Sequence, residues 1–480
     1  MKRLKGFIAC AAMVAVLMSA VIAGNYVTRS EGEAPSHKRS SITKEQMKDW
    51  DAPDEEVLDY YGIGRFRTKL PVVYLNTKGQ QVLKENYIMG TAALLDADGT
   101  EQSIYAVPNS IYTAAIKYRG ASSYSKFDKK QFRIRFYKWD SGKEASVSLA
   151  GMGRNSEWVL NGPYLDKTLM RNKLVYDLAR ELNGWAPDSR FVELFEDGDY
   201  KGVYLAVEPV TNGESRLRLS EFSLLSGQTA YIVNRDRIGT ESTELETYGK
   251  IHGYTSNALY YSYPSEKKIT RQQLAYITED VSAFEKALYG ENFQDPNLGY
   301  AAYIDIDNWV DYFIINEFAM NYDAGNLSTY AYKELTGKLQ LAVWDFNNGF
   351  DNFQRSPLEE TEFYTVENSW INRVCQDRNF IDKVVSRYHQ LRQSTLSDAH
   401  IQELMTSYRE QLGDAAFRNF KVWGYSFQEN LLVEGDSGTD RNIRSYEQAL
   451  TQLETTIRKR LAYLDQNMEA LYDYCLNSEV

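Results

Sequence analysis

Apolar positions between residues 70 and 207 recur with the two-residue period, or in the short continuous runs, that are typical of β-strands. The expected strands cover residues 72–75, 87–95, 112–119, 131–137, 158–161, 191–194 and 202–207. The run 131–137 alternates most clearly: its Phe and Ile residues fall on one face, and its two Arg residues and Tyr137 fall on the other. The first half of the chain is therefore predicted to be rich in β-structure.

A helical period interrupts these strands at residues 166–182 and dominates the later part of the chain. The other expected helices cover residues 270–288, 305–320, 380–392, 398–411 and 442–472. Strands are expected at 231–234 and 258–263, and a hairpin at 328–333 and 338–343 with its turn at Thr336 and Gly337. This order predicts an α+β fold in two lobes, a β-rich lobe at 69–210 and a helical lobe at 211–480.

The N-terminus has a different pattern. Lys2, Arg3 and Lys5 precede an apolar run at residues 6–23, which is long enough to reach across a bilayer. Residues 1–24 are therefore predicted to be a signal peptide or a membrane anchor, and the remainder to be exported. Residues 25–68 are polar with little periodicity, which predicts a linker. Any membrane contact is expected through the N-terminal segment alone.

Composition excludes several classes of function. The net charge of −12 and the lack of a dense Lys/Arg block argue against a nucleic-acid partner. The 4 His are scattered and the 3 Cys form no CxxC, so a zinc site is not indicated. Cys10 lies in the apolar run, which leaves Cys375 and Cys475 as the one pair that can form a disulfide in the folded part. The 36 Tyr suit carbohydrate or protein contacts, or a large core.

Two acidic residues flank the predicted hairpin. Asp323 follows the helix at 305–320, and Asp345 follows the second strand of the hairpin. A hairpin can return the second acid close to the first, so that one orients a hydroxyl and the other holds a divalent cation. Both are equally the kind of residue that forms turns.

A small-residue loop and a lysine follow one another in the β-rich half. Residues 119–123 read Arg-Gly-Ala-Ser-Ser, a turn that can bring backbone N–H groups near a phosphate or simply close a hairpin. Lys130 opens the strand after it and is placed either to reach a phosphate or to end a solvated strand. Neither GxGxxG nor GxxxxGK[ST] is present.

The order of short motifs carries a resemblance. Along the chain these are residues 117–123 (KYRGASS), 129–134 (KKQFRI), 169–173 (LMRNK), 190–194 (RFVEL), 202–205 (GVYL), the Asp323 loop and 344–346 (WDF). The series resembles the spore-coat protein H (CotH) kinase family, whose members look like atypical protein kinases. The likeness runs from about residue 70 to about residue 351. It implies a two-lobed, atypical protein-kinase-like fold with a β-rich N-lobe and a helical C-lobe.

The resemblance also implies roles for individual residues. Asp323 would be the catalytic acid that faces a Ser or Thr hydroxyl of a protein substrate, and Asp345 would bind Mg²⁺ beside ATP. Lys130 would contact the nucleotide phosphates. Arg119, Gly120, Ser122 and Ser123 would form the loop over the nucleotide, and Glu208 would lie at the hinge.

One departure from the family concerns the metal. Members often carry a second acid two residues after the metal-binding Asp, where this chain has Asn347. Asn347 and Asn326 can still offer oxygen atoms to Mg²⁺, with one negative charge fewer. A non-catalytic cell-surface or spore-coat protein that keeps the kinase-like fold is therefore the alternative interpretation. A carbohydrate-active enzyme is a third, although no further acid pair stands out.

Overall fold

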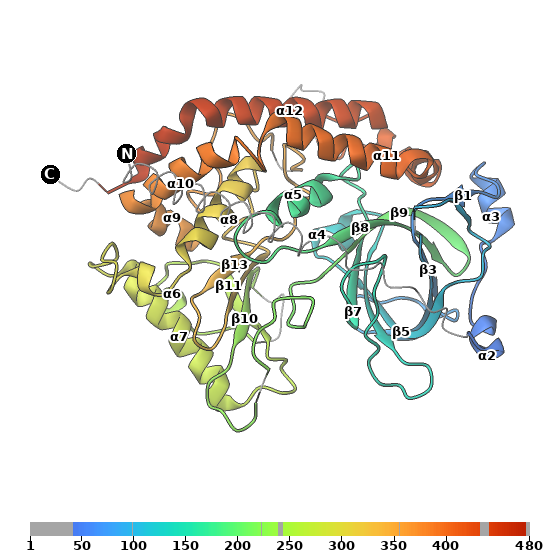
Figure 1. The fold of residues 1–480 in the computed structure, drawn as a ribbon, viewed down its shortest axis with the longest axis horizontal. Helices are drawn as coiled ribbons and strands as arrows, with labels where there is room; N and C mark the ends of the chain where they lie inside the picture. Colours follow the sequence, from blue (N-terminus) through green and yellow to red (C-terminus); the bar gives the residue numbers. More distant parts are fainter. Residues whose placement is uncertain are drawn as a thin grey trace, which may run out of the picture. The chain divides into compact units, whose positions relative to one another are not determined.

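The computed structural model describes residues 42–97, 99–221, 223–238, 243–354, 356–432 and 441–476. The chain divides into two units, Met1–Thr43 and Lys44–Val480. The second unit is a mixed α+β structure (Figure 1). The signal peptide or anchor predicted at residues 1–24 lies outside the described residues. In the described part of the chain, no helix combines the length and the apolar character needed to cross a membrane.

Seven strands form a closed barrel. In barrel order they are β2 (Val72–Asn76), β3 (Ile88–Leu95), β5 (Ser110–Arg119), β6 (Gln131–Tyr137), β7 (Glu157–Asn161), β9 (Asp199–Val207) and β8 (Ser189–Glu196). Parallel pairing of β2 with β8 closes the barrel, while the other neighbours pair antiparallel. Closure leaves no exposed strand edge.

The alternation predicted for residues 131–137 is confirmed. Phe132, Ile134 and Phe136 are buried in the barrel interior, where they join a hydrophobic cluster with Trp158. Arg133 and Arg135 keep partial exposure on the outer face. Because side chains alternate across a strand, burying the Phe and Ile residues inside the barrel places both guanidinium groups outside.

A second sheet has four antiparallel strands. Their order is β11 (Ala258–Tyr263), β10 (Tyr231–Asp236), β12 (Thr329–Lys333) and β13 (Gln340–Ala342). Strands β12 and β13 form the predicted hairpin. Figure 1 shows this sheet beside the long helix α7 (Arg271–Tyr289), apart from the barrel strands.

The other main helices are α5 (Arg171–Ala179), α8 (Ile306–Phe318), α9 (Ser369–Cys375), α10 (Arg378–Leu391), α11 (Asp398–Trp423) and α12 (Tyr446–Asn467). Outward-facing barrel residues, such as Phe191 and Leu205, share one hydrophobic cluster with them. Cys375 and Cys475 are free thiols, so the one possible disulfide is not formed.

Part of the predicted linker is ordered structure instead. Residues 44–68 contain α2 (Lys44–Lys48), α3 (Glu55–Tyr60) and β1 (Arg67–Thr68), which pairs with β4 (Gln102–Ser103). Leu58 of α3 is fully buried, and Asp54 caps this helix by accepting hydrogen bonds from two backbone N–H groups. Such short helices show no measurable period and depend on tertiary packing, so the polar sequence did not predict them.

Candidate functional site

Asp323 and Asp345 come together although they lie on different loops. Asp323 follows α8, and Asp345 follows β13 in a left-handed conformation with φ 62°. Asn348 Nδ2 donates to Asp323 Oδ2 at 3.4 Å. The Asp323 charge also raises the pKa of the Asp345 carboxyl. The two acids therefore lie near enough for the charge of one to act on the other.

The Asp345 carboxyl has a strongly perturbed environment. Burial raises its pKa to about 6; Arg119 opposes the rise, while Asp323 and Asp236 add to it. Asp236 is the last residue of β10, whose pairing with β12 places Arg235 opposite Thr329. This third acid was not singled out from the sequence, because nothing local distinguishes it from any charged strand end. Only the order of strands in the sheet brings it here.

Helix α5 positions the segment that carries Asp345. The backbone N–H of Asp345 donates to the Tyr176 hydroxyl at 3.2 Å, and that of Phe346 donates to Asn172 Oδ1 at 2.6 Å. Arg171 Nε donates to the Gly349 carbonyl at 3.1 Å. The motif at residues 169–173 thus acts by holding the Asp345 loop in place.

Arg119 brings a positive charge to this site. It ends β5, donates through Nη1 to Gln131 Oε1 at 2.5 Å, and lies over the Trp344 ring with 5.6 Å to the centroid. Gly120 follows with φ 96°, and a Cβ there would meet Ser123 Oγ at 2.1 Å. A residue with a side chain cannot take this turn without moving its neighbour.

The loop after Gly120 is more structured than expected. Ser122 and Ser123 begin the short helix α4 (Ser122–Lys126). At its end, Lys126 Nζ donates to Gln354 Oε1 at 3.4 Å. The loop is thereby tied to the segment that follows Asp345.

The Lys130 ammonium is held by backbone carbonyls of the preceding segment. Its Nζ donates to the Tyr124 carbonyl at 2.7 Å and to the Phe127 carbonyl at 2.6 Å. These bonds hold the end of α4 against β6. The geometry therefore gives the phosphate-contact role expected of Lys130 no support.

Glu208 directly follows β9, at the end of the barrel strands, and its role at a hinge stays a prediction. Its carboxylate is bound to Arg216 and accepts from the Asp188 N–H at 3.1 Å. It lines a pocket of about 700 Å³ that also includes Gly337. Gly337 is at the turn of the β12–β13 hairpin, whereas Asp345 follows the other end of β13. Glu208 and Asp345 are thus at opposite ends of this hairpin.

The asparagines expected at the metal differ in their placement. Asn347 Nδ2 donates to Asn348 Oδ1 at 3.2 Å, which links it through Asn348 to Asp323. Asn326 Nδ2 instead donates to Asn368 Oδ1 at 2.6 Å. Asn347 therefore belongs to the group around the two acids, and Asn326 is held at its margin.

The donor set suits a hard cation that keeps some of its water. Within the described residues, no group of three or more His, Cys, Asp or Glu side chains is arranged to hold a metal ion. Mg²⁺, however, is commonly bound by one or two carboxylates together with phosphate oxygens. Asp345, Asp323 and the Asn347 amide oxygen match that requirement, and the charges of Asp323 and Asp236 add to the rise that burial causes in the pKa of Asp345.

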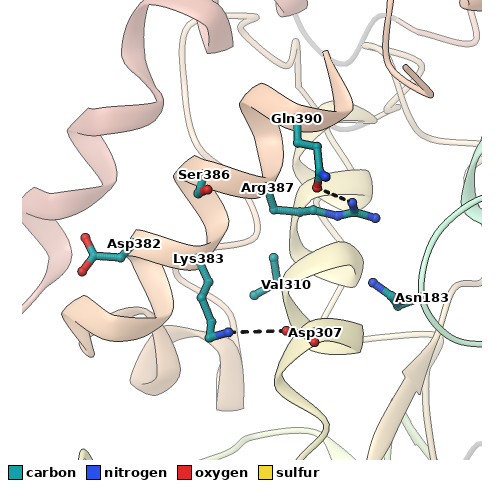
Figure 2. Close-up of a pocket in the computed structure, with 8 residues that line it drawn as sticks. All are labelled: Asn183, Asp307, Val310, Asp382, Lys383, Ser386, Arg387 and Gln390. Carbon is teal, nitrogen blue, oxygen red and sulfur yellow. Dashed lines mark hydrogen bonds and ion pairs between the residues drawn. The ribbon is translucent and has the colours of Figure 1, made fainter. Parts of the chain in front are cut away.

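A separate pocket of about 410 Å³ lies between α8 and α10 (Figure 2). Its cations are paired within the protein: Lys383 Nζ lies 3.5 Å from Asp307 Oδ1, and Arg387 Nε donates to Asp311 Oδ1 at 2.8 Å. Asp323, Asp345 and Asp236 do not line it. Its charges are already satisfied, so it offers a weaker site than the Asp323–Asp345 region.

Comparison with known proteins agrees with this geometry. A protein-family model described as CotH kinase protein matches residues 116–464, which is well over half of the chain. The chain is also 26% identical over 314 residues to the inner spore coat protein H of Bacillus subtilis (strain 168), a match that covers 59% of this chain and 78% of that protein. The matched range includes both acids, Arg119 and the α5 motif. The chain therefore belongs to the CotH kinase protein family.

Proposed function

We propose that this protein is a Mg²⁺-dependent protein kinase that transfers the γ-phosphate of ATP to Ser or Thr hydroxyls of an exported protein. The observation that carries the proposal is the meeting of Asp323 and Asp345, which flank one hairpin, with Arg119 from a distant part of the chain. Phosphoryl transfer depends mainly on positioning and on charge neutralisation, which such a group supplies.

Asp323 would act on the acceptor. Its carboxylate is oriented by Asn348 and would accept the proton of the attacking hydroxyl. The hydroxyl oxygen then forms a bond to the γ-phosphorus as the bond to the β,γ-bridging oxygen breaks, so that ADP leaves. A positioned carboxylate of this kind contributes about 10²–10⁴-fold to the rate.

Asp345 and Asn347 would hold the metal. A bound Mg²⁺ would neutralise charge on the phosphate oxygens. The left-handed backbone at Asp345 and its two neighbouring bonds to α5 fix where that carboxylate lies. Strain of this kind is frequent at functional sites.

The same proposal assigns the two parts of the fold to two lobes. The barrel would be the N-lobe, at residues 69–210, and residues 211–480 would be the C-lobe. The loop at 119–126 would cover the nucleotide from the barrel side. The tie between Lys126 and Gln354 supports this arrangement, because it joins the loop to the segment that carries the metal-binding acid.

A structural role in a surface or spore coat is the second candidate. The relative in Bacillus subtilis is named as an inner spore coat protein, and Asn347 removes one charge from the metal site. The predicted N-terminal signal or anchor would place the protein outside the cytoplasm, and ATP is scarce there. In this alternative the fold is kept for assembly, and the substrate and metal sites are not used.

One experiment separates the two. In the first assay, the melting temperature of the purified protein is measured with and without millimolar ATP and Mg²⁺. In the second, an unheated portion is incubated with radiolabelled ATP and a Ser/Thr-rich acceptor such as casein. A kinase raises its melting temperature with ATP and Mg²⁺ together, because ligand binds the folded state only, and it incorporates label. Asp345→Ala should lose both signals. A wild-type protein without either signal would favour the coat role.

A further inference from the structure

Lys130 leaves the proposed site without its expected phosphate contact, because its ammonium is bound by two carbonyls of its own loop. A triphosphate carries several negative charges and needs a cation on the barrel side. The outer face of the same strand, β6, carries two arginines, Arg133 and Arg135. Either Arg133 or Arg135 could supply this cation beside Asp323 and Asp345.

Arg133 and Arg135 share one carboxylate. Arg133 contacts Glu157 of β7 through Nε and Nη2, and Arg135 Nε donates to Glu157 Oε2 at 2.9 Å. Two guanidinium groups against one carboxylate leave the cluster with net positive charge. The side chains of Arg133 and Arg135 remain 35% and 40% exposed, and that of Glu157 is 13% exposed. The carboxylate is thus at the base, and the arginines face outward.

Arg133 is the arginine nearer to Arg119, because it lies two residues along β6 from Gln131, the partner of Arg119, whereas Arg135 lies four residues along. Strand pairing sets Arg119 opposite Gln131 and Lys117 opposite Arg133, so all four lie on one face of β5 and β6. Burial lowers the pKa of Arg133, but Glu157, Tyr87 and Tyr330 together raise it. Tyr330 contacts Trp344 edge-on at 6.0 Å, next to Asp345 in the chain. Arg135 lies over the Tyr87 ring, 5.0 Å from its centroid.

We infer that Arg133, held by Glu157 and joined by Arg119, contacts the nucleotide phosphates in the place that the family resemblance assigns to Lys130. The inference rests on the proposed function, since it names the phosphate contact of that site. A guanidinium can bind two phosphate oxygens at once, which an ammonium cannot do with the same geometry. Glu157 occupies Nε and Nη2 of Arg133, and so directs the rest of the group away from β7.

The test measures the affinity for ATP and for AMP by titration calorimetry with Mg²⁺ present. The variant is Arg133→Gln, and its matched control is Arg135→Gln, which removes the other partner of Glu157 on the same strand. Arg133→Gln should weaken ATP binding by about tenfold or more, the effect of one charged hydrogen bond, and AMP binding by less. Arg135→Gln and Lys130→Gln should each change ATP affinity by less than about threefold.

Each outcome bears on a different claim. If wild type binds ATP, and Lys130→Gln abolishes binding while Arg133→Gln does not, the inference is overturned and the kinase proposal stands. If wild type binds no ATP, both are overturned. Should Arg133→Gln fail to fold, Arg133→Lys keeps the charge but loses the planar fork. It should then show intermediate affinity, and wild-type affinity in that variant would contradict the inference.

Discussion

Among single residues, Asp345 shows most clearly how the site trades stability for function. A carboxyl whose pKa in the folded protein is raised to about 6 holds its proton between pH 4 and 6, while the unfolded chain has already lost it. The folded state is thus destabilised as the pH rises through this window, and it stays so at pH 7. Groups placed for ligand binding often carry such a cost.

Asp345→Asn should therefore stabilise the protein without ligand at pH 7, by about 1–3 kcal/mol. The variant keeps the shape of the side chain and removes the buried charge. Urea unfolding at pH 4.5 and at pH 7 measures the free energy of unfolding. The difference between variant and wild type should be small at pH 4.5 and large at pH 7. A constant difference at both values would show that Asp345 is not the group that titrates.

The two acids should differ in kinetics. Asp323→Asn should lower the rate of phosphate transfer by about 100-fold or more, because it removes the proton acceptor. It should keep most of the melting-temperature rise given by ATP and Mg²⁺, whereas Asp345→Asn should lose that rise. Radiolabel incorporation and thermal shift are measured on the same preparations. Equal losses of binding in both variants would contradict the division of roles.

Sequence reasoning reached part of this residue set. Asp323 and Asp345 stood out because a predicted hairpin lies between them, and short-range geometry brings them together. Asp236 did not, because its approach to the site depends on which strands become neighbours. Lys130 was assigned by motif, and its real contacts depend on the turn of α4, which no local pattern encodes.

For helices and strands, the hydrophobic period predicted individual elements, but it did not predict that seven strands close into a barrel. The strands 131–137 and 258–263 were predicted with the bounds that the structure has. The barrel itself depends on the parallel pairing of β2 with β8, which are far apart in sequence. Helix α11 continues to Trp423, beyond the predicted 398–411, because the chain resumes helical geometry after a kink at Gly413. Long-range pairing and kinks leave little trace in a local period.

The β5–α4 loop offers a prediction at this scale. Gly120→Ala should destabilise the protein by about 1–3 kcal/mol, since it forces a side chain into a left-handed turn and against Ser123. Because the loop is expected to cover the nucleotide, affinity for ATP should also fall. Urea unfolding and calorimetry measure the two effects.

Gly79→Ala is the matched control for the loop. Gly79 has a comparable φ of 72°, but an added Cβ would meet no atom within 4 Å. It should show only the cost of the backbone conformation and no change in ATP affinity. If both variants behave alike, the contact with Ser123 does not shape the site.

For the whole unit Lys44–Val480, two buried lysines join the barrel to the C-terminal helices. Lys129 Nζ donates to the Val203 carbonyl at 2.6 Å and to Asn419 Oδ1 of α11 at 2.7 Å. Lys167 Nζ donates to the Tyr164 carbonyl at 2.7 Å and to Ser426 Oγ at 2.5 Å. Burial lowers the pKa of both, that of Lys129 further through the charge of Lys167. The junction is therefore sensitive to protonation.

Stability should rise with pH above neutrality. Burial lowers the pKa of Lys167 to about 7, against the partial opposition of Glu429 and Asp166. Between pH 7 and pH 10 the unfolded chain binds a proton on this lysine that the folded protein does not. One such group adds up to about 1.4 kcal/mol to the free energy of unfolding per pH unit. Urea unfolding at pH 7, 8 and 9 measures the slope.

Lys167→Met should reduce that slope by the contribution of one proton, up to about 1.4 kcal/mol per pH unit. This holds whatever the substitution does to stability at a single pH. Lys383→Met is the control, because the Lys383 side chain is 56% exposed and pairs with Asp307 at the surface. It should leave the slope unchanged. A wild-type protein whose stability is flat or falling between pH 7 and 9, with the same slope in Lys167→Met, would mean that Lys167 stays charged in the folded state. In that case the contact between barrel and helices is an ion–dipole contact, and it depends on the Ser426 and Tyr164 oxygens for its strength.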